Sequence, residues 1–338
     1  EVLFRRYPLL LGMSCQLREP GDYLTDDFTG IPILVVRGED GRVRAFHNVC
    51  RHRGARVAEG CGKRPKSFVC PYHGWSYDLQ GMLRGIPDQR NFPGVERERH
   101  GLVPLPAAER HGLVWVQPSQ AGAGADLDAQ RHLGARLDAE LASYGLERFH
   151  HYETRVIHRR MNWKLVIDTF LEPYHLGVLH RNTVAAIFVP NVCLFEAFGP
   201  HLREVLPRRS IETLRGRPER EWDLIVHSAI VYVLFPNTVF VMQADHVETW
   251  RVFPCAGRVD ECAMYLDFYV PDPVDSDSAR RHWERNMDLT IRTVCDEDFP
   301  TSEGMQRGFG SGAQSHVTYG RNEPALAHFE RAVSDALE

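Results

Sequence analysis

Two short stretches of the chain, "CRHRG" at residues 50–54 and "CPYHG" at residues 70–74, are near copies of each other. Each pairs a cysteine with a histidine and ends on a glycine, giving the pattern C-x-H-x17-C-x2-H over Cys50, His52, Cys70 and His73. A structural zinc site usually takes two cysteines from one loop. Here each loop supplies one thiolate and one imidazole, which favours a [2Fe–2S] cluster with two cysteines on one iron and two histidines on the other.

Two alternative roles for these four residues are less consistent with the sequence. Unrelated core residues would follow an apolar periodicity, whereas these lie in glycine-containing loops. A disulfide between Cys50 and Cys70 would leave both histidines without a role and is disfavoured in a reducing compartment. The other six cysteines have no such histidine partners and are expected to be small apolar core residues.

The sequence around the two loops has the pattern of a small all-β unit. Runs of β-branched and aromatic residues, separated by turn residues, predict strands within residues 31–38, 43–49, 67–70, 75–83 and 112–119. The stretch that follows, "PSQAGAGADLDA" at residues 118–129, is the most linker-like of the chain. We therefore predict one domain over residues 1–125 and a second over residues 126–338.

The second domain is predicted to be α+β, with a sheet packed against helices. Residues 222–270 are rich in β-branched and aromatic residues with turns between them, which predicts several antiparallel strands. Helical patterns cover residues 137–146, 276–292 and 325–337. Near Asn162 the pattern changes from strand to helix.

The stretch "NWKLVIDTFLEPYHLGVLH" at residues 162–180 carries a second group of ligand-type side chains. Asp168, Glu172 and His175 are spaced i, i+4, i+7, so they would share one helix face, where buried acids are costly unless paired or metal-bound. His180 would lie about 140° from His175 on an ideal helix, so both reach one ion only if the helix is broken or widened, which Pro173 and Gly177 would allow. Two histidines and a distant carboxylate fit a mononuclear non-haem Fe(II) site. A charged helix on a surface is the alternative.

Together, the two motifs resemble the catalytic (α, large) subunit of Rieske non-haem iron oxygenases, the family of the aromatic-ring-hydroxylating dioxygenases. The resemblance runs from about residue 30 to the C-terminus. It implies an N-terminal Rieske domain and a helix-grip (START-like) catalytic domain. It also implies that the four residues of the loops hold the cluster and that His175, His180 and Asp298 hold the iron. In the acidic run at residues 295–300, Asp296 is the second choice for the third ligand.

The resemblance further implies how such a subunit works with its partners. Electrons from NAD(P)H reach it through a separate reductase, with or without a ferredoxin. Subunits assemble head to tail as a homotrimer, or as α3β3 with a small subunit, because the cluster and the iron of one subunit are too far apart. Glu172 would bridge His73 of one subunit and His175 of the next. Asp168 would add a charge near the iron, where many members have asparagine.

The predicted function is that of a terminal oxygenase that hydroxylates an apolar, aromatic substrate, with residues 183–199 and strands within 230–245 lining the pocket. The alternative is a monooxygenase or demethylase of an amine or quaternary ammonium compound. Glu172 favours this alternative, since some amine-oxidising members resemble the chain in having glutamate there. Two classes of non-enzymatic protein are further alternatives. An electron-transfer Rieske protein without catalysis would not need the second motif. A zinc-stabilised binding module would be colourless, unlike an iron–sulfur protein.

The composition restricts the partners and the compartment. A formal net charge of −5 gives no electrostatic basis for binding nucleic acid or an anionic membrane. No apolar run reaches the roughly 18 residues of a membrane span. We therefore expect a cytoplasmic protein that acts on a small molecule and O2.

Overall fold

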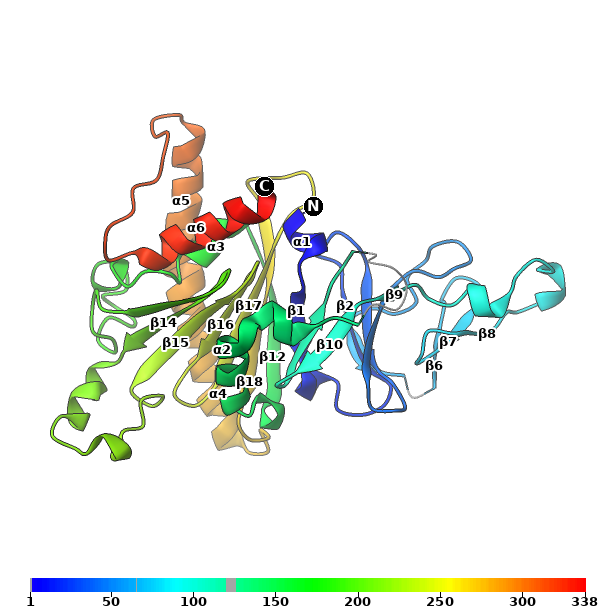
Figure 1. Cartoon of the computed structure of the whole chain (residues 1–338), viewed down its shortest axis with the longest axis horizontal. Coiled ribbons are helices and arrows are strands. Elements are labelled where there is room, and N and C mark those ends of the chain that lie inside the picture. The colour runs from blue at the N-terminus through cyan, green and yellow to red at the C-terminus, as the bar shows by residue number, and fades with distance from the viewer. Residues whose placement is uncertain (1, 65, 120–125) are drawn as a thin grey trace. The chain divides into compact units, whose positions relative to one another are not determined.

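The computed structural model describes residues 2–64, 66–119 and 126–338, and the chain divides into two compact units, Glu1–Arg148 and Phe149–Glu338 (Figure 1). The sequence-based boundary at 125/126 lies at the edge of residues 120–125, which are outside the described residues. The units divide later because helix α2 (Ala129–Ser143) packs on strand β10 (Ala107–Arg110) of the first unit. There the Arg110 guanidinium donates to the Asp138 carboxylate.

The first unit is built from three small antiparallel sheets, whose strand orders are β1-β11-β10, β5-β2-β3-β4-β9 and β6-β7-β8. The strands other than β10 are β1 (Leu9–Met13), β2 (Asp22–Asp26), β3 (Ile33–Arg37), β4 (Val43–His47), β5 (Cys61–Lys63), β6 (Ser67–Val69), β7 (Ser76–Asp78), β8 (Leu83–Gly85), β9 (Pro104–Leu105) and β11 (Leu113–Val116). The five predicted strand regions correspond to β3, β4, β6, β7–β8 and β11. The prediction of a small β-sheet domain that ends near residue 118 is therefore confirmed, and helix α2 follows it within the same unit.

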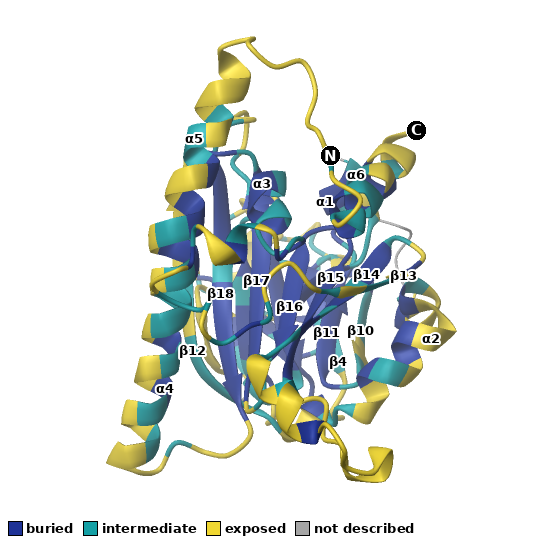
Figure 2. Ribbon diagram, turned by 90° about the vertical axis from the view of Figure 1, so that its left-hand side faces the viewer, coloured by how far each residue is buried: buried dark blue, intermediate teal, exposed yellow. Residues whose placement is uncertain are grey.

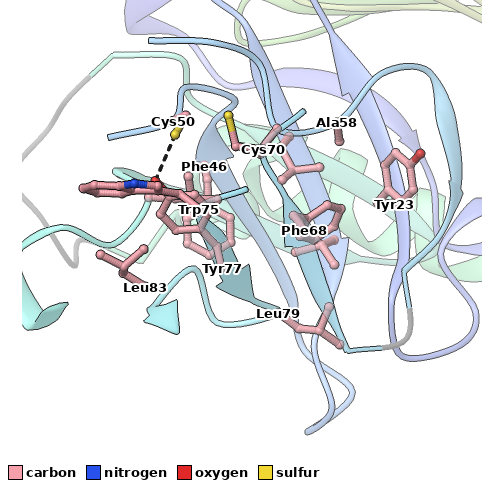
Figure 3. Packing of buried hydrophobic residues seen from close by; sticks show 14 of the residues in the cluster. Tyr23, Phe46, Cys50, Ala58, Phe68, Cys70, Trp75, Tyr77, Leu79 and Leu83 are labelled. Atoms are coloured by element: carbon pink, nitrogen blue, oxygen red, sulfur yellow. Dashed lines mark hydrogen bonds between the residues drawn. The ribbon is translucent and has the colours of Figure 1, made fainter. Parts of the chain in front are cut away.

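An apolar core lies beneath the two cysteine loops (Figure 3). Phe68, Trp75 and Tyr77 are almost completely buried in it, together with the side chains of Cys50 and Cys70. Burying large aromatic rings contributes a large share of the stability of so small a sheet unit. The core thus fixes the position of both loops through the residues that flank them.

The second unit contains one seven-stranded antiparallel sheet, in the order β12-β18-β17-β16-β15-β14-β13. Its strands are β12 (His150–Arg159), β13 (Leu194–Phe198), β14 (His201–Pro207), β15 (Ser228–Leu234), β16 (Thr238–Met242), β17 (Val247–Pro254) and β18 (Cys262–Val270). Strands β15 and β16 are buried at every position, so both faces of the sheet are covered there (Figure 2). The predicted α+β fold, with an antiparallel sheet and helices, is confirmed.

Helices surround this sheet. The first helix of this unit is α3 (Trp163–Asp168). Much later in the chain, three segments follow one another without a gap: α4 (Asp277–Thr290), the π-helix η8 (Ile291–Asp298) and α5 (Phe299–Gly310). Figure 2 shows α4 and α5 as parts of one long helical column. The last helix, α6 (Pro324–Leu337), packs on β14 and β13. A short helix, α1 (Val2–Arg6), belongs to the first unit. No helix in the described ranges is long and apolar enough to cross a membrane.

Candidate metal centres and substrate cavity

The two cysteine loops fold as copies of each other. The first follows β4, and the second joins β6 to β7. In each, the cysteine N–H donates to the carbonyl five residues on (Cys50 to Ala55, 2.7 Å; Cys70 to Trp75, 2.8 Å). In each, the glycine N–H donates back to the cysteine carbonyl, at 2.9 Å and 3.0 Å. Both glycines have positive φ, of 82° and 73°, which explains why glycine ends each loop.

The loops bring their four ligand-type side chains together. The Cys50 and Cys70 side chains are buried, and the His52 and His73 rings lie 4.6 Å apart between centroids. His52 stacks on Trp75, and its buried Nδ1 has no hydrogen-bond partner among the described residues. A [2Fe–2S] cluster with mixed ligands requires two thiolates and two imidazole nitrogens, which these four residues supply, so they fit such a cluster.

The environment of the cysteines also favours a bound metal over free thiolates. Burial raises the pKa of the Cys50 thiol, although the Tyr77 hydroxyl, 3.3 Å from Sγ, partly offsets this effect. The same hydroxyl accepts from the Arg51 N–H at 2.9 Å. A buried thiolate is therefore unfavourable unless a cation compensates its charge, as iron would.

The second constellation is built differently from the prediction. Helix α3 begins after Asn162, whose side chain accepts from the Lys164 N–H, and it ends at Asp168. The expectation that Asp168, Glu172 and His175 share one helix face is therefore wrong. His175 begins a separate 3-10 turn, η5 (His175–Gly177). The interruption comes before His175: the Phe170 and Leu171 N–H groups donate to i−3 carbonyls, and Pro173 has no N–H with which to continue the helix.

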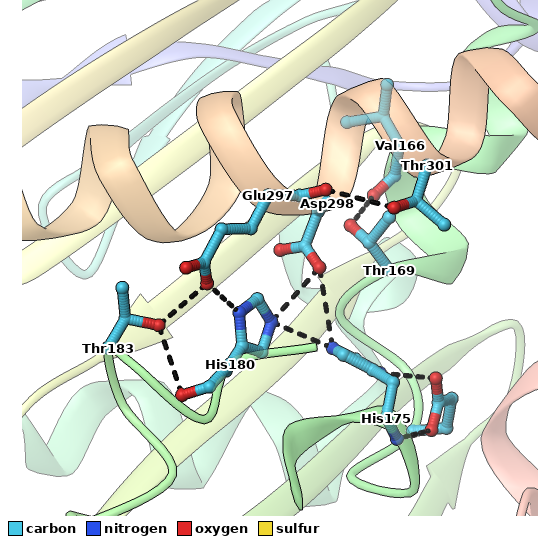
Figure 4. Close-up of polar contacts among 9 residues, drawn as sticks. Val166, Thr169, His175, His180, Thr183, Glu297, Asp298 and Thr301 are labelled. Atoms are coloured by element: carbon cyan, nitrogen blue, oxygen red, sulfur yellow. Dashed lines mark hydrogen bonds and ion pairs between the residues drawn. The ribbon is translucent and has the colours of Figure 1, made fainter. Parts of the chain in front are cut away.

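Three side chains meet at the end of this loop: His175, His180 and Asp298 (Figure 4). Their potential ligand atoms lie within 4.8 Å of one another. His180 Nε2 is 3.1 Å from His175 Nε2 and 3.0 Å from Asp298 Oδ1, and His175 Nε2 is 3.5 Å from the same oxygen. Neighbouring ligands at about 2.1 Å from one octahedral ion lie about 3 Å apart, so the geometry fits a two-histidine, one-carboxylate metal site.

Carboxylates behind the triad orient both imidazoles. Glu172 accepts from the backbone N–H of His175 at 3.0 Å and contacts Nδ1 of the same residue. Glu297 lies 2.6 Å from Nδ1 of His180 and accepts from the Thr183 hydroxyl at 2.7 Å. Each contact fixes the ring so that Nε2 faces the triad. Sequence reasoning missed the role of Glu297, although its place beside Asp298 was the available signal.

The third member of this group, Asp298, comes from the π-helix. Asp298 is the last residue of η8 and is buried, whereas Asp296 is exposed and does not belong to the group. Burial raises the pKa of Asp298 against the opposing effect of His180. Burial lowers the pKa of His180, but the Asp298 and Glu297 carboxylates more than offset it, so the net shift is upward. The triad thus combines a buried carboxylate with imidazoles, which suits a divalent cation.

Asp168 lies beside the triad but is not one of its members. It lines a smaller cavity that shares Glu172, His175 and Asp298 with the main cavity of the second unit. Burial, reinforced by the Glu330 carboxylate and opposed by Lys164, raises the pKa of Asp168 to about 8. Its Oδ1 is buried without a hydrogen-bond partner among the described residues.

The main cavity of the second unit has a volume of about 530 Å³ and includes the triad in its wall. Its apolar lining comes from the segment after His180 and from the strands of the sheet, as the sequence predicted: Val184, Ile187, Phe188, Val231 and Val241 are examples. A polar group made of Arg208, Gln243, Asp245, His246 and Glu248 also lines it. The cavity therefore combines apolar walls, a metal-type triad and a charged region.

Two family models match the chain. Residues 8–104 match the Rieske [2Fe–2S] domain, and residues 146–338 match the ring hydroxylating alpha subunit (catalytic domain). The chain belongs to the Rieske oxygenase α subunits. It is therefore an oxidoreductase that incorporates oxygen from O2, and its cofactors are a Rieske [2Fe–2S] cluster and mononuclear iron.

Relatives of this α subunit act on two kinds of compound. The glycine betaine monooxygenase oxygenase subunit of Chromohalobacter salexigens is 35% identical over 94% of this chain and 78% of its own length. The biphenyl 2,3-dioxygenase subunit alpha of Rhodococcus jostii is 30% identical over 77% of this chain and 54% of its own length. The crystal structure of the quaternary ammonium Rieske monooxygenase CntA with L-carnitine has a TM-score of 0.82 at 20% identity, covering 99% of this chain and 90% of that one, which shows a shared fold.

Proposed function

We propose that this α subunit is the terminal oxygenase of a monooxygenase that removes a methyl group from a quaternary ammonium compound. The observation that carries the proposal is the similarity to a glycine betaine monooxygenase over nearly the whole chain. This similarity supports an amine or quaternary ammonium substrate, the alternative prediction, better than the predicted aromatic substrate, because the aromatic dioxygenase relative matches a smaller part of the chain. Glutamate at position 172 supports the same alternative.

The reaction balances with the cofactors of the family. One atom of O2 enters a C–H bond of an N-methyl group, and the other leaves as water, with two electrons and one proton from NAD(P)H and a further proton from solvent. The N-hydroxymethyl product then releases formaldehyde. When bound, the cluster carries single electrons and the mononuclear iron supplies the oxygen chemistry.

In this proposal the residues of the chain have separate roles. Cys50, Cys70, His52 and His73 hold the cluster, and His175, His180 and Asp298 hold the iron in the cavity wall. Glu172 and Glu297 orient the two iron-ligand imidazoles through Nδ1. The apolar walls exclude bulk water from the space beside the triad.

The proposal is tested by product analysis with the holoenzyme and a surrogate reductase. Glycine betaine, carnitine and choline are compared with biphenyl and benzoate. We expect formaldehyde in step with NAD(P)H oxidation for at least one methylated ammonium compound. Hydroxylated or dihydroxylated aromatic products, without formaldehyde from any ammonium compound, would overturn the proposal in favour of an aromatic substrate.

A ligand test accompanies it. His175→Ala should leave the red-brown colour and the rhombic EPR signal of the cluster intact, lower the iron content from about three to about two per chain, and abolish turnover. Bleaching of the cluster in this variant would show that the ligands have been divided wrongly between the two centres.

A further inference from the structure

One charged side chain in the wall of the main cavity, that of Arg208, has no ionic partner among the described residues. Arg208 follows β14 directly, is half-buried, and is the only arginine or lysine among the described residues that line the cavity. Its Nε donates to the Ser228 carbonyl at 3.2 Å and its Nη2 to Gln243 Oε1 at 2.6 Å. The guanidinium also lies 5.5 Å from the centre of the Phe188 ring. Two hydrogen bonds and an aromatic contact thus hold it in one orientation.

The acidic groups nearby are already used by others. His246 lies between Asp245 and Glu248, at 2.8 Å and 3.2 Å from their carboxylate oxygens. Asp245 also contacts His282 at 3.1 Å, and Glu248 accepts from the Thr290 hydroxyl at 3.1 Å. These carboxylates lie near enough to favour the charged form of Arg208, but in the described parts of the chain no carboxylate comes within 4.0 Å of its guanidinium.

Among the described residues, the third guanidinium nitrogen of Arg208 has no hydrogen-bond partner. Nη1 makes no hydrogen bond to any described residue, although the other two nitrogens do. A guanidinium keeps its charge at neutral pH even where burial lowers its pKa, as it does here. A half-buried cation that is oriented by the protein and unpaired on one side is a binding site for an anion.

We propose that Arg208 binds the carboxylate of a zwitterionic substrate, which carries a carboxylate and an N-methylated ammonium group on one molecule. The inference rests on the proposed function and narrows it. Because Arg208 and the iron triad line the same cavity, a molecule held by its carboxylate at Arg208 can extend its methylated nitrogen toward the triad. An alcohol such as choline would leave the guanidinium unpaired, and such sites reject ligands that lack the matching group.

Direct binding to the holoenzyme tests the proposal without turnover. Isothermal titration calorimetry compares glycine betaine and L-carnitine with choline, which has the same cationic head but no carboxylate. We expect the wild type to bind the two carboxylated compounds more tightly. Arg208→Gln should weaken their binding by about 10- to 100-fold, the usual effect of losing a hydrogen bond to a charged group, and should leave choline binding unchanged.

Two further variants separate charge from structure. Arg208→Lys keeps the charge but not the fork of donors, so it should recover part of the lost affinity. Arg209→Gln is the matched control, because Arg209 is the next residue, is exposed, and does not line the cavity. All variants should keep the cluster absorbance and the melting temperature of the wild type within a few degrees.

The outcomes distinguish this inference from the proposed function. Equal loss of choline and betaine binding in Arg208→Gln would show that Arg208 only shapes the cavity, and unchanged binding of both would show that it has no role; either result overturns the inference and leaves the proposed function standing. Binding of benzoate that depends on Arg208, with no binding of any ammonium compound, would overturn the proposed function and the zwitterion together.

Discussion

At the scale of single residues, each imidazole of the iron triad is held by a carboxylate on its far nitrogen. Glu172 holds His175 from three residues away in sequence, whereas Glu297 contacts His180 from 117 residues away. Such contacts fix the ring tautomer and raise the basicity of the ligand. The two adjacent acids of the π-helix thus have separate tasks: Asp298 faces the metal position and Glu297 faces the back of a ligand.

Glu297→Gln should weaken iron binding without unfolding the protein. An amide in place of the carboxylate loses the charge-assisted contact with His180 Nδ1, and losses of this kind typically cost 10- to 100-fold in metal affinity. Titration of the iron-free mononuclear site with Fe(II) or Co(II) measures the effect. Asp296→Asn, which changes an exposed neighbour, should bind metal like the wild type; if Asp296→Asn lost the iron, Asp296 would be the third ligand.

Asp168→Asn should stabilise the protein at alkaline pH. Burial and the Glu330 carboxylate raise the pKa of Asp168 to about 8, above its ordinary value near 4. Between these values the folded state binds more protons than the unfolded state, so the free energy of unfolding falls as the pH rises through this window. Asparagine removes that dependence.

Melting curves at pH 5.5 and pH 8.5 check this expectation. The stabilisation by Asp168→Asn should be about 1–3 kcal/mol at pH 8.5 and smaller at pH 5.5. Asp296→Asn serves as the exposed control. A difference between variant and wild type that is the same at both pH values would mean that Asp168 is ionised throughout, paired with a group that the described residues do not show.

At the scale of elements, the positions of the ligands depend on irregular backbone. The loops of the cluster end on glycines with positive φ, and Asp298 ends a π-helix of eight residues between two α-helices. π-helical segments are uncommon and are often found at functional sites, because they place side chains that a regular helix would turn elsewhere. Regular helices and strands form the scaffold, and these irregular segments orient the candidate ligand side chains.

Gly54 and Gly74 form a natural pair for testing the loops. Both have positive φ, so alanine at either position should cost about 1–2 kcal/mol. A Cβ at Gly54 would meet nothing within 4 Å, whereas at Gly74 it would lie 3.1 Å from Cγ of Pro87. We therefore expect Gly74→Ala to lower the melting temperature and the cluster content more than Gly54→Ala. Equal effects would show that Pro87 moves away freely.

These elements also show how far the sequence predicts the molecule. Strands such as β3, with four consecutive buried apolar residues, were predictable from local pattern. The strand β5 was not, because its three residues are exposed and are held only by pairing with β2. The early end of α3 and the π-helix were missed as well, because the local sequence pattern does not distinguish these segments from a regular α-helix.

At the scale of the whole molecule, the side chains of the candidate site could be predicted from motif spacing and, for Asp298, from the family resemblance, but their orientation could not. Cys50, His52, Cys70, His73, His175, His180 and Asp298 were all chosen from the sequence. Glu297 and Arg208 were not, because their roles depend on distant residues, His180 in one case and Ser228 and Gln243 in the other. The fold of the sheet and of the α4–η8–α5 helical column brings these residues together, and a local sequence pattern does not reveal such long-range contacts.

Assembly is the remaining question at this scale, and we expect the subunits to form a head-to-tail trimer in which the cluster of one chain serves the iron of its neighbour. Complementation tests this directly. A chain with His73→Ala lacks a working cluster, and a chain with His175→Ala lacks the iron; each alone should be inactive. Co-expression with two affinity tags and sequential purification isolates the mixed oligomers.

A mixed trimer of the two variants has a defined expected activity. In a closed ring of three with one direction of electron transfer, any mixture contains one junction at which an intact cluster faces an intact iron, so about a third of the wild-type turnover should return. If electrons passed within each chain, every chain in the mixture would lack one centre and the activity would be zero. The mixed trimers could instead be inactive although they keep the cluster signal and the mononuclear iron expected from their composition. This result would contradict electron transfer between subunits, and with it the bridging role assigned to Glu172.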